Sequence, residues 1–267
     1  MLANYKLIEL MEDNMRSKLQ YIPSMLPDMT IDQIADTAIV NTGMPSDTFN
    51  TAFAGTITES HALAVMQYFK NAVMPMAWWI GPESTAHSPH CIDSLHNAGF
   101  THDEQDIGMY AFLEDLNLDN RPDSSGLHIK LCSDATDYLD FGYVLASIFD
   151  PVDTYVQIFY KKTAMLPPSS MTKAKLFVGY AHNKPVTTGC LFLTDFAAGF
   201  YDIATCPNQQ RRGFGSAMFH HLVAFAHQAG YKHGVLQASA DGLNIYKRIG
   251  FQSVCEFNVW SNKNTLD

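Results

Sequence analysis

The stretch CPNQQRRGFGSAMFHH, residues 206–221, carries the strongest structural signal in the chain. It separates a run with strand-like alternation, GFYDIAT (199–205), from a run with helical spacing that begins at about Gly213. Gly213 and Gly215 have no Cβ atom, so a ligand can approach the backbone there. The first amides of a helix lack intrahelical partners and lie at the positive end of its dipole. The stretch therefore predicts an anion site built mostly from main chain, suited to a pyrophosphate.

Two nucleotide-binding loops do not fit this stretch. A phosphate-binding GxxxxGK[ST] loop is absent from the chain, and a dinucleotide GxGxxG loop fails because Met218 stands where the third glycine belongs. Arg211 and Arg212 add positive charge beside the glycines. Taken alone, the pattern is also consistent with glycines that simply close a turn.

The rest of the chain alternates strand and helix patterns. The first half predicts helices over 4–20, 30–40, 59–72 and 88–100, and strands over 49–58, 75–81 and 106–116. The second half predicts helices over 133–149, 151–165, 213–229 and 241–251, and strands over 127–132, 199–205, 233–239 and 253–260, with a strand pair over 173–195.

Charge and turn residues divide the chain into two parts. Residues 1–126 carry 5 Lys or Arg and 17 Asp or Glu, whereas residues 127–267 carry 12 and 10. The run NLDNRPDSSG (117–126) has the composition of a linker. We therefore predict two domains, 1–120 and 121–267. The net charge of −10 argues against a nucleic-acid partner.

Cysteine spacing and hydropathy predict a cytoplasmic protein. The five cysteines form no CxxC pair or zinc spacing, which indicates free thiols and no metal site. The first 25 residues are too polar for a signal peptide, and no run approaches the ~18 apolar residues that would span a membrane. We expect no membrane partner.

The two halves also share a pattern. Residues 75–110 and 232–260 each contain a strand, a helix that ends in Gly-Phe, a polar turn and a strand that ends in an aromatic residue. Gly99-Phe100 corresponds to Gly250-Phe251. Such self-similarity indicates that the first half is a degenerate copy of the second.

Gln210-Arg211-Arg212-Gly213-Phe214-Gly215 resembles the Arg/Gln-x-x-Gly-x-Gly/Ala signature of the GNAT acetyltransferase superfamily. The downstream NIYKRIGF, with Tyr246 before Gly250-Phe251, is similar to the family's next helix. The resemblance covers about 127–261. It implies an α/β (α+β) GNAT fold: a central mixed, mostly antiparallel sheet flanked by helices, preceded here by a degenerate GNAT-like N-terminal domain without the CoA loop.

The resemblance also implies an enzyme, an N-acetyltransferase that uses acetyl-CoA as cosubstrate and needs no metal. It assigns Tyr246 as the general acid for the leaving thiolate. It assigns CoA binding to the strand at Ile203, Ala204 and Thr205, and to a loop comprising Gln210, Arg211, Arg212, Gly213, Phe214, Gly215 and Ser216. Ser239 stands where many members have Asn, which weakens one polar contact to CoA but leaves the loop unaffected.

Several alternatives stay open at this point. Tyr246 is also consistent with a half-buried helix residue, and Asp202 with either a general base or a solvated side chain, the latter being favoured. The acceptor is a primary amine of a small molecule or protein whose identity the sequence does not give, and a homodimer is an option. The competing functions are a non-catalytic CoA-binding regulator or scaffold and a nucleotide-binding regulator.

Overall fold

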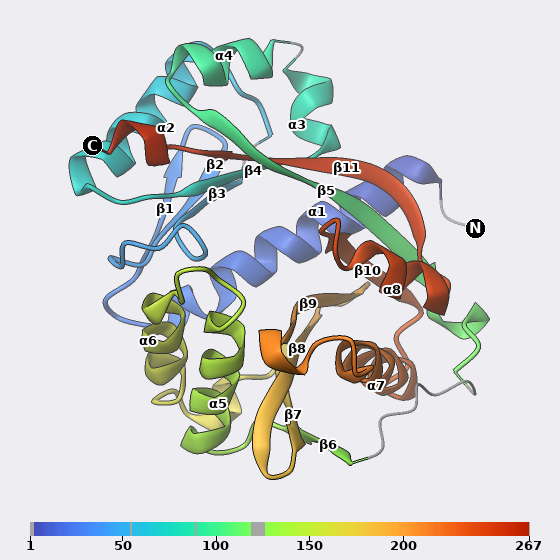
Figure 1. Ribbon diagram of the computed structural model, residues 1–267. Helices are drawn as coiled ribbons and strands as arrows, with labels where there is room; N and C mark the ends of the chain where they lie inside the picture. The colour runs from blue at the N-terminus through green and yellow to red at the C-terminus, as the bar shows by residue number, and fades with distance from the viewer. Residues whose placement is uncertain (1–2, 54, 89, 119–125, 267) are drawn as a thin grey trace. The chain divides into compact units, whose positions relative to one another are not determined.

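The computed structural model describes residues 3–53, 55–88, 90–118 and 126–266, in two compact units (Figure 1). Unit 1 comprises Met1–Gly108 and Val254–Asp267, and unit 2 comprises Met109–Ser253. Two strands, β5 (Thr101–Phe112) and β11 (Gln252–Ser261), have residues in both units. The linker proposed at 117–126 lies mostly outside the described residues, and the boundary at 120/121 stays a prediction.

Unit 1 is a sheet with helices. Its elements are α1 (Asn4–Tyr21), β1 (Thr30–Ile34), β2 (Thr37–Asn41), β3 (Thr51–Phe53), α2 (Glu59–Ala72), β4 (Ala77–Ile80), α3 (Pro82–His87), α4 (Cys91–Asn97) and parts of β5 and β11. The strand order is β1-β2-β3-β4-β11-β5. Strands β1, β2 and β3 are antiparallel, whereas β4 runs parallel to β3. The core lies under α2, around Trp78 and Phe69.

Unit 2 repeats this topology. Its elements are β6 (Leu127–Leu131), α5 (Ala135–Ala146), α6 (Thr154–Thr163), β7 (Ala174–Ala181), β8 (Lys184–Leu193), β9 (Ala198–Thr205), α7 (Phe214–Gln228), β10 (His233–Ala238) and α8 (Leu243–Ile249). The order is β5-β10-β9-β8-β7-β6. Strands β6 to β9 are antiparallel, and β10 runs parallel to β9.

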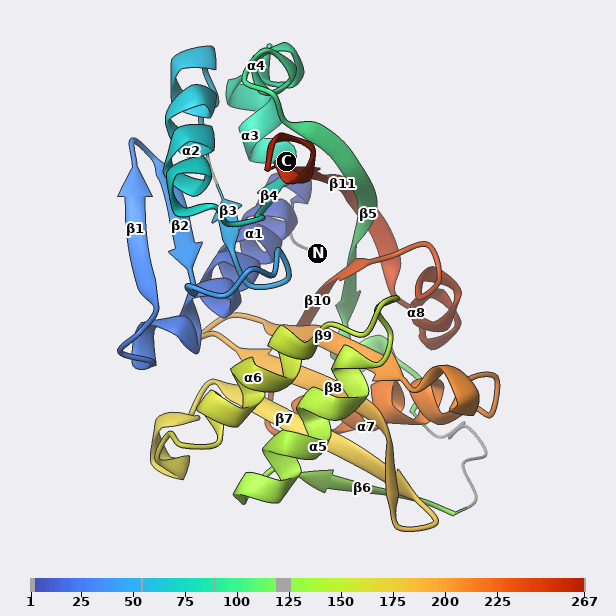
Figure 2. The ribbon, with the colours of Figure 1, turned by 60° about the vertical axis from the view of Figure 1, so that its left-hand side comes forward.

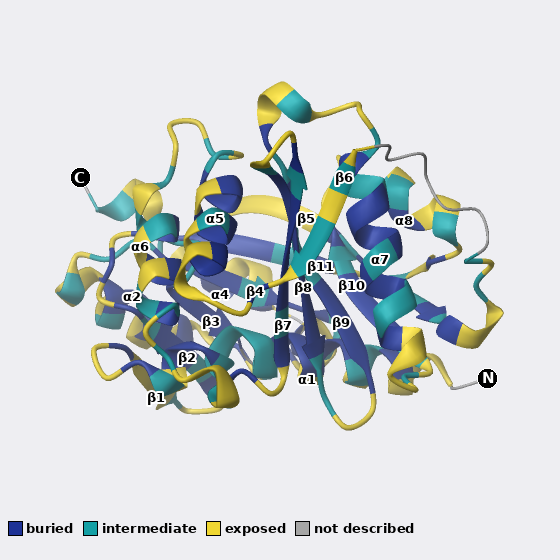
Figure 3. Cartoon of the chain, turned by 90° about the horizontal axis from the view of Figure 1, so that it is seen from below, coloured by how far each residue is buried: buried dark blue, intermediate teal, exposed yellow. Residues whose placement is uncertain are grey.

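Helices cover both faces of the sheet in unit 2. A Cβ atom at Gly189 of β8 would lie 2.7 Å from Leu222 of α7, so the missing side chain admits that helix. Tyr180 of β7 donates a hydrogen bond of 2.8 Å to Asp140 of α5. Figure 2 shows α5 and α6 lying across the strands. Because both faces are covered, β7 and β8 are nearly continuous buried runs (Figure 3), whereas the second half of β9 is mostly half-buried.

The internal repeat is confirmed at the level of topology. Three antiparallel strands, a helix and a parallel strand occur as β1-β2-β3-α2-β4 and again as β7-β8-β9-α7-β10. Gly99 and Gly250, paired by the sequence pattern, both have positive φ, +92° and +116°, just after α4 and α8. Each ends its helix in a conformation that glycine adopts without strain.

One sequence-based assignment is wrong. Residues 30–40 are the β1–β2 hairpin and not a helix, because its β-branched side chains favour strands and Ala35 turns the chain at φ 53°. A short helix that the sequence did not predict, α3, follows β4: Pro82 is its first residue, a position that proline favours because its missing N–H has no helical partner there.

Glu12 of α1 makes unit 1 sensitive to pH. The side chain is 1 % exposed, and its Oε1 atom accepts a hydrogen bond of 3.0 Å from the amide of Glu83. Burial raises the pKa of Glu12 from 4.5 to about 7, although the Glu83 amide partly opposes this. The folded state therefore favours the protonated form, and the stability contributed by Glu12 is lost as pH rises from about 4.5 through 7.

We expect the free energy of unfolding of Glu12→Gln to exceed that of the wild type by about 3 kcal/mol at pH 8 and to equal it at pH 4, as measured by denaturant unfolding. The glutamine side chain keeps the oxygen that accepts from the backbone amide of Glu83, and it never ionises. Glu9→Gln, at an exposed position of the same helix, is the matched control and should change neither value. An identical pH profile for Glu12→Gln and the wild type would contradict the assignment.

Candidate functional site

The sheet of unit 2 opens between two parallel strands. Strands β9 and β10 pair at Gly234↔Ala198 and Val235↔Gly199 only, although β9 continues to Thr205 and β10 to Ala238. The three sequence-predicted strand residues, Ile203, Ala204 and Thr205, all lie beyond the last paired position. Among the described residues, their backbone groups on the β10 side therefore have no strand partner, and an extended ligand can bond to them as a strand would.

A β-bulge lies at the start of this opening. Thr188 pairs with Ala204 but Cys190 pairs with Tyr201, so β9 has an extra residue here, and Asp202 has φ 51°. The hydroxyl of Thr188 donates to the carbonyl of Asp202 at 3.0 Å. A bulge re-aims the main chain next to it. The bulge thus sets the direction of the amides that follow, in the segment expected to face a thioester carbonyl.

The predicted anion loop is held against the end of β9. Gln210 donates from Nε2 to the carbonyl of Thr205 at 3.3 Å. A Cβ atom at Gly215 would lie 3.2 Å from Oγ1 of Thr205. Phe214, 4 % exposed, packs in a cluster with Ala181 and Val186. The structure therefore brings Thr205, Gln210 and Gly215 together, as the sequence pattern requires.

The first turn of α7 presents free amides. Gly213 is the N-cap with φ 80°, and the first helical bond runs from the amide of Ala217 to the carbonyl of Gly213 at 2.9 Å. Within the described ranges, no acceptor bonds to the amides of Phe214, Gly215 and Ser216. Arg211 precedes them with φ 60°. Uncapped amides at the positive end of a 15-residue helix suit a phosphate group.

The two arginines of the loop differ. Arg212 donates from Nη1 to Oε1 of Gln209 at 2.6 Å, and its guanidinium lies 5.1 Å from the ring centre of Phe214. It is therefore held along the loop, and its charge remains exposed. Arg211 is exposed next to it. Both supply positive charge at the edge of the amide cradle.

Tyr246 lies on α8 and contacts α7, the helix that begins at the predicted anion loop. Its ring is 9 % exposed and meets Phe219 of α7 edge-on, with 4.7 Å between the ring centres. A Cβ atom at Gly242 would lie 3.1 Å from the Tyr246 hydroxyl and 2.8 Å from the ring. Gly242 thus leaves room for the phenol at the start of α8, and the ring is fixed by packing.

Sequence reasoning missed one partner of this strand. Tyr160 of α6 donates a hydrogen bond of 3.3 Å to Oδ2 of Asp202. Burial, with the nearby carboxylate, raises the pKa of Tyr160 well above 10, so it stays a hydroxyl donor. Asp202 is therefore tied to a buried tyrosine and is only partly exposed. Nothing in the helix pattern around Tyr160 distinguishes it from an ordinary core aromatic residue.

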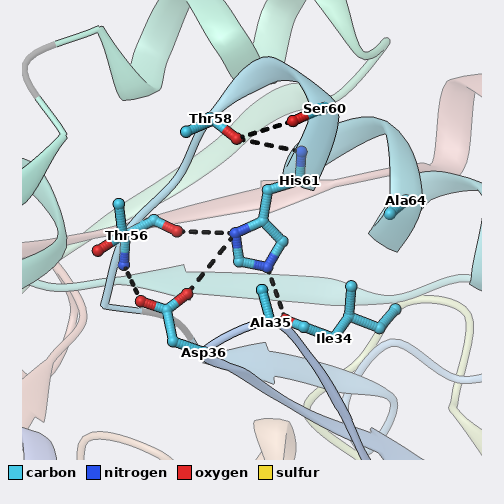
Figure 4. A pocket seen from close by; sticks show the side chains of 8 residues that line it. All are labelled: Ile34, Ala35, Asp36, Thr56, Thr58, Ser60, His61 and Ala64. Carbon is cyan, nitrogen blue, oxygen red and sulfur yellow. Dashed lines mark hydrogen bonds and ion pairs between the residues drawn. The ribbon is translucent and has the colours of Figure 1, made fainter.

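The equivalent loop of unit 1 carries a carboxylate of the chain. Asp36, in the β1–β2 turn, accepts at Oδ2 from the amide of Thr56 at 2.9 Å, and its Oδ1 lies 3.6 Å from Nδ1 of His61 (Figure 4). A Cβ atom at Gly55 would lie 3.3 Å from the same carboxylate. The carboxylate thus lies in the loop before α2, and the hydroxyl of Thr58 caps the first turn of α2 by accepting from the amide of His61.

His61 bonds to both sides of this loop. Its Nδ1 atom lies 2.8 Å from the carbonyl oxygen of Thr56, and its Nε2 atom lies 2.7 Å from the carbonyl oxygen of Ile34 and from Oγ1 of Thr37. The ring is 8 % exposed. These bonds tie the β1–β2 hairpin to α2, which is a structural use of the loop.

Among the residues that the structure describes, no group of three or more His, Cys, Asp or Glu side chains is placed to hold a metal ion. No helix in this part of the chain has the length and apolar character needed to cross a membrane.

A known family model matches part of unit 2. The model described as "Acetyltransferase (GNAT) domain" matches residues 172–253, the span from β7 to the first residues of β11, which contains the opening and the loop. Residues 172–253 are therefore a GNAT domain, and the family predicted from the sequence is confirmed. No curated protein matches the sequence.

Solved structures show the same fold over nearly the whole chain. A GCN5-related N-acetyltransferase from Kribbella flavida is 13% identical, covers 94% of this chain and 95% of its own, and has a TM-score of 0.67. A tandem GNAT protein from the clavulanic acid biosynthesis pathway is 9% identical, with coverage of 93% and 86% and a TM-score of 0.60. A GCN5-related N-acetyltransferase-like protein from Streptococcus suis is 13% identical, covers 94% of this chain and 98% of its own, and has a TM-score of 0.55. The predicted fold class, GNAT with a GNAT-like first half, is confirmed.

Proposed function

We propose that this protein transfers an acetyl group from acetyl-CoA to a primary amine of a small molecule or a protein. The observation that carries the proposal is the row of unbonded amides at Phe214, Gly215 and Ser216, placed beside the opening between β9 and β10. A GNAT domain over the same residues supports acyl transfer.

Different residues of the site bind different parts of acetyl-CoA in this proposal. The amides from Arg211 to Ser216 bind the pyrophosphate, with Arg211 and Arg212 adding charge at the edge. The backbone of Ile203 to Thr205 bonds the pantetheine arm along the opening. An amide of this segment, aimed by the bulge at Asp202, polarises the acetyl carbonyl.

Tyr246 acts on the leaving group in this proposal. The amine nitrogen attacks the thioester carbonyl, the carbon–sulfur bond breaks, and the amide bond forms. The thiolate then takes a proton from the hydroxyl of Tyr246, since a tyrosine hydroxyl ordinarily keeps its proton at pH 7. The proton lost by the amine leaves through solvent or a base.

A non-catalytic role has one observation in its favour. The ring of Tyr246 is packed on Phe219, as a core residue would be. In that case the protein would bind CoA and release no thiol with any amine. Cytoplasmic location, a homodimer and the absence of nucleic-acid and membrane partners remain predictions from sequence.

The direct test measures thiol release from acetyl-CoA with a panel of primary amines. Thermal shift with CoA, ATP and NAD accompanies it, and a ligand at about 100 times its Kd stabilises a protein by roughly 2.7 kcal/mol. Stabilisation by CoA with thiol release supports the enzyme. Stabilisation by CoA without release favours a binding protein, and stabilisation by ATP or NAD instead of CoA overturns the assignment.

We expect one CoA to bind per chain. In unit 1 the hydroxyl of Thr58 already caps the first turn of α2, and the carboxylate of Asp36 in the loop before it repels a phosphate. Isothermal titration of the full chain should give a stoichiometry near one, and Asp36→Asn, which keeps the side-chain shape, should not change the affinity of that site. Two equivalent sites in the wild type would contradict the interpretation of Asp36.

A further inference from the structure

One buried amide in unit 2 has no partner. Gln237 lies on β10, two residues beyond the last position that pairs with β9. Its amide nitrogen and oxygen are both buried, and neither makes a hydrogen bond to any part of the chain that the structure describes. Leaving a primary amide buried and unbonded costs free energy, so a ligand that bonds it is favoured.

The side chain faces the side of the sheet away from α7. A Cβ atom at Gly234 would lie 3.1 Å from Phe200, whose ring meets Phe219 of α7 at 5.4 Å. Gly234 therefore faces α7. Side chains alternate along a strand, so Gln237, three residues later, faces the opposite side.

Polar groups of β9 gather on the same side. Tyr201 follows Phe200, so it also faces away from α7, and like Gln237 it lies two residues beyond the last paired position of its strand. Asp202 comes next, bonded to Tyr160 of α6. The end of the opening that faces α5 and α6 thus carries a carboxylate, tyrosine hydroxyls and the Gln237 amide.

The cradle and Tyr246 belong to the α7 side. The amides of the loop begin α7, and the ring of Tyr246 contacts Phe219 of that helix. If a thioester lies in the opening between β9 and β10, Tyr246 would protonate its leaving sulfur from the α7 side. Its carbonyl carbon would then be open to attack from the other side, where Gln237 lies.

We propose that Gln237 hydrogen-bonds the acetyl acceptor on the sheet face toward α5 and α6, and that it selects amines bearing a hydroxyl or carboxamide group. This inference rests on the proposed function. A primary amide both donates and accepts, which matches a hydroxyl or a carboxamide. An alkyl amine would leave both amide atoms unbonded, and sites built to bond a polar group reject analogues that lack it. The carboxylate of Asp202 nearby suits a cationic amine.

The test compares two pairs of amines of similar size: alaninamide with butylamine, and glucosamine with cyclohexylamine. The wild type should use at least one polar amine with a kcat/KM at least tenfold above that of its apolar counterpart. Gln237→Met, which keeps the length and removes both polar atoms, should lose this preference. Its Kd for acetyl-CoA should stay within about twofold, and its Tm should be equal or higher because no bond is lost. Gln237→Asn keeps the chemistry one methylene shorter, and should retain part of the preference.

The outcomes separate the two proposals. If the wild type binds acetyl-CoA but prefers no polar amine over its counterpart, the inference on Gln237 fails and the proposed function stands. If Gln237→Met weakens acetyl-CoA binding and leaves the acceptor KM unmoved, Gln237 serves the CoA arm and the inference is overturned. If Gln237→Met loses stability, the amide is a structural bond and the inference is overturned too. If the wild type does not bind acetyl-CoA, the proposed function itself is wrong.

Discussion

Tyr246→Phe is expected to lower kcat by about 10²–10⁴-fold while the Kd for CoA stays nearly constant. The substitution keeps the ring, and with it the edge-on contact to Phe219 and the fit against Gly242. It removes only the hydroxyl that would protonate the departing thiolate. Steady-state kinetics with acetyl-CoA and titration with CoA measure the two quantities separately.

Tyr110→Phe is the matched control for this experiment. Its hydroxyl lies 2.9 Å from Nδ1 of His233, also within unit 2, so the loss of one hydrogen bond is reproduced away from the cradle. The control should lower stability by about 1 kcal/mol and leave kcat unchanged. A Tyr246→Phe protein with normal kcat and lowered stability would instead make Tyr246 a packing residue.

Gly213→Val is expected to weaken CoA binding by at least 100-fold while most of the fold persists. Gly213 has φ 80°, a region that β-branched residues scarcely adopt, so the loop must change its path. The amides of the first turn of α7 would then lose their common direction, and binding by main-chain amides depends on that direction. Isothermal titration with CoA measures the loss.

Gly230→Val is the control that separates the effect of backbone strain on stability from the loss of the CoA site. Gly230 follows the other end of α7 with φ 87°, and no atom lies within 4 Å of a Cβ added there. The two variants therefore place the same β-branched residue at positive φ near opposite ends of one helix. Both should be destabilised, and only Gly213→Val should lose CoA. Unchanged CoA affinity in Gly213→Val would refute the cradle.

The spacing of residues along the chain was enough to predict the cradle. Gln210, Gly213 and Gly215 lie within six residues, between a strand and a helix that are both strongly patterned. Because the local backbone conformation and the helix dipole would create the proposed anion site, sequence alone contains most of what that site requires. The position of Tyr246 followed from the resemblance, whereas its catalytic role remains for kinetics to test.

Contacts between distant segments were beyond the sequence. The bond from Tyr160 to Asp202 joins α6 to β9, and the carboxylate of Asp36 reaches the loop before α2 across 20 residues. The sequence also does not show that the side-chain amide of Gln237 is unbonded. Strand alternation predicts which face of the sheet a residue is on, but not whether its side chain has a hydrogen-bond partner. Burial and hydrogen bonding depend on what packs around a group.

The sequence by itself determined the GNAT loop, the order of most strands and helices in the second half, and the repeat in the first. Tertiary structure alone decided where the compact units end. Met109–Phe112 of β5 belongs to unit 2, and Val254–Ser261 of β11 belongs to unit 1. The domain boundary predicted at 120/121 from composition stays a prediction. Turn residues indicate where the chain bends. The unit that a strand belongs to depends on where its backbone groups find hydrogen-bond partners and where its side chains are buried. Backbone pairing and side-chain burial are both properties of the folded chain.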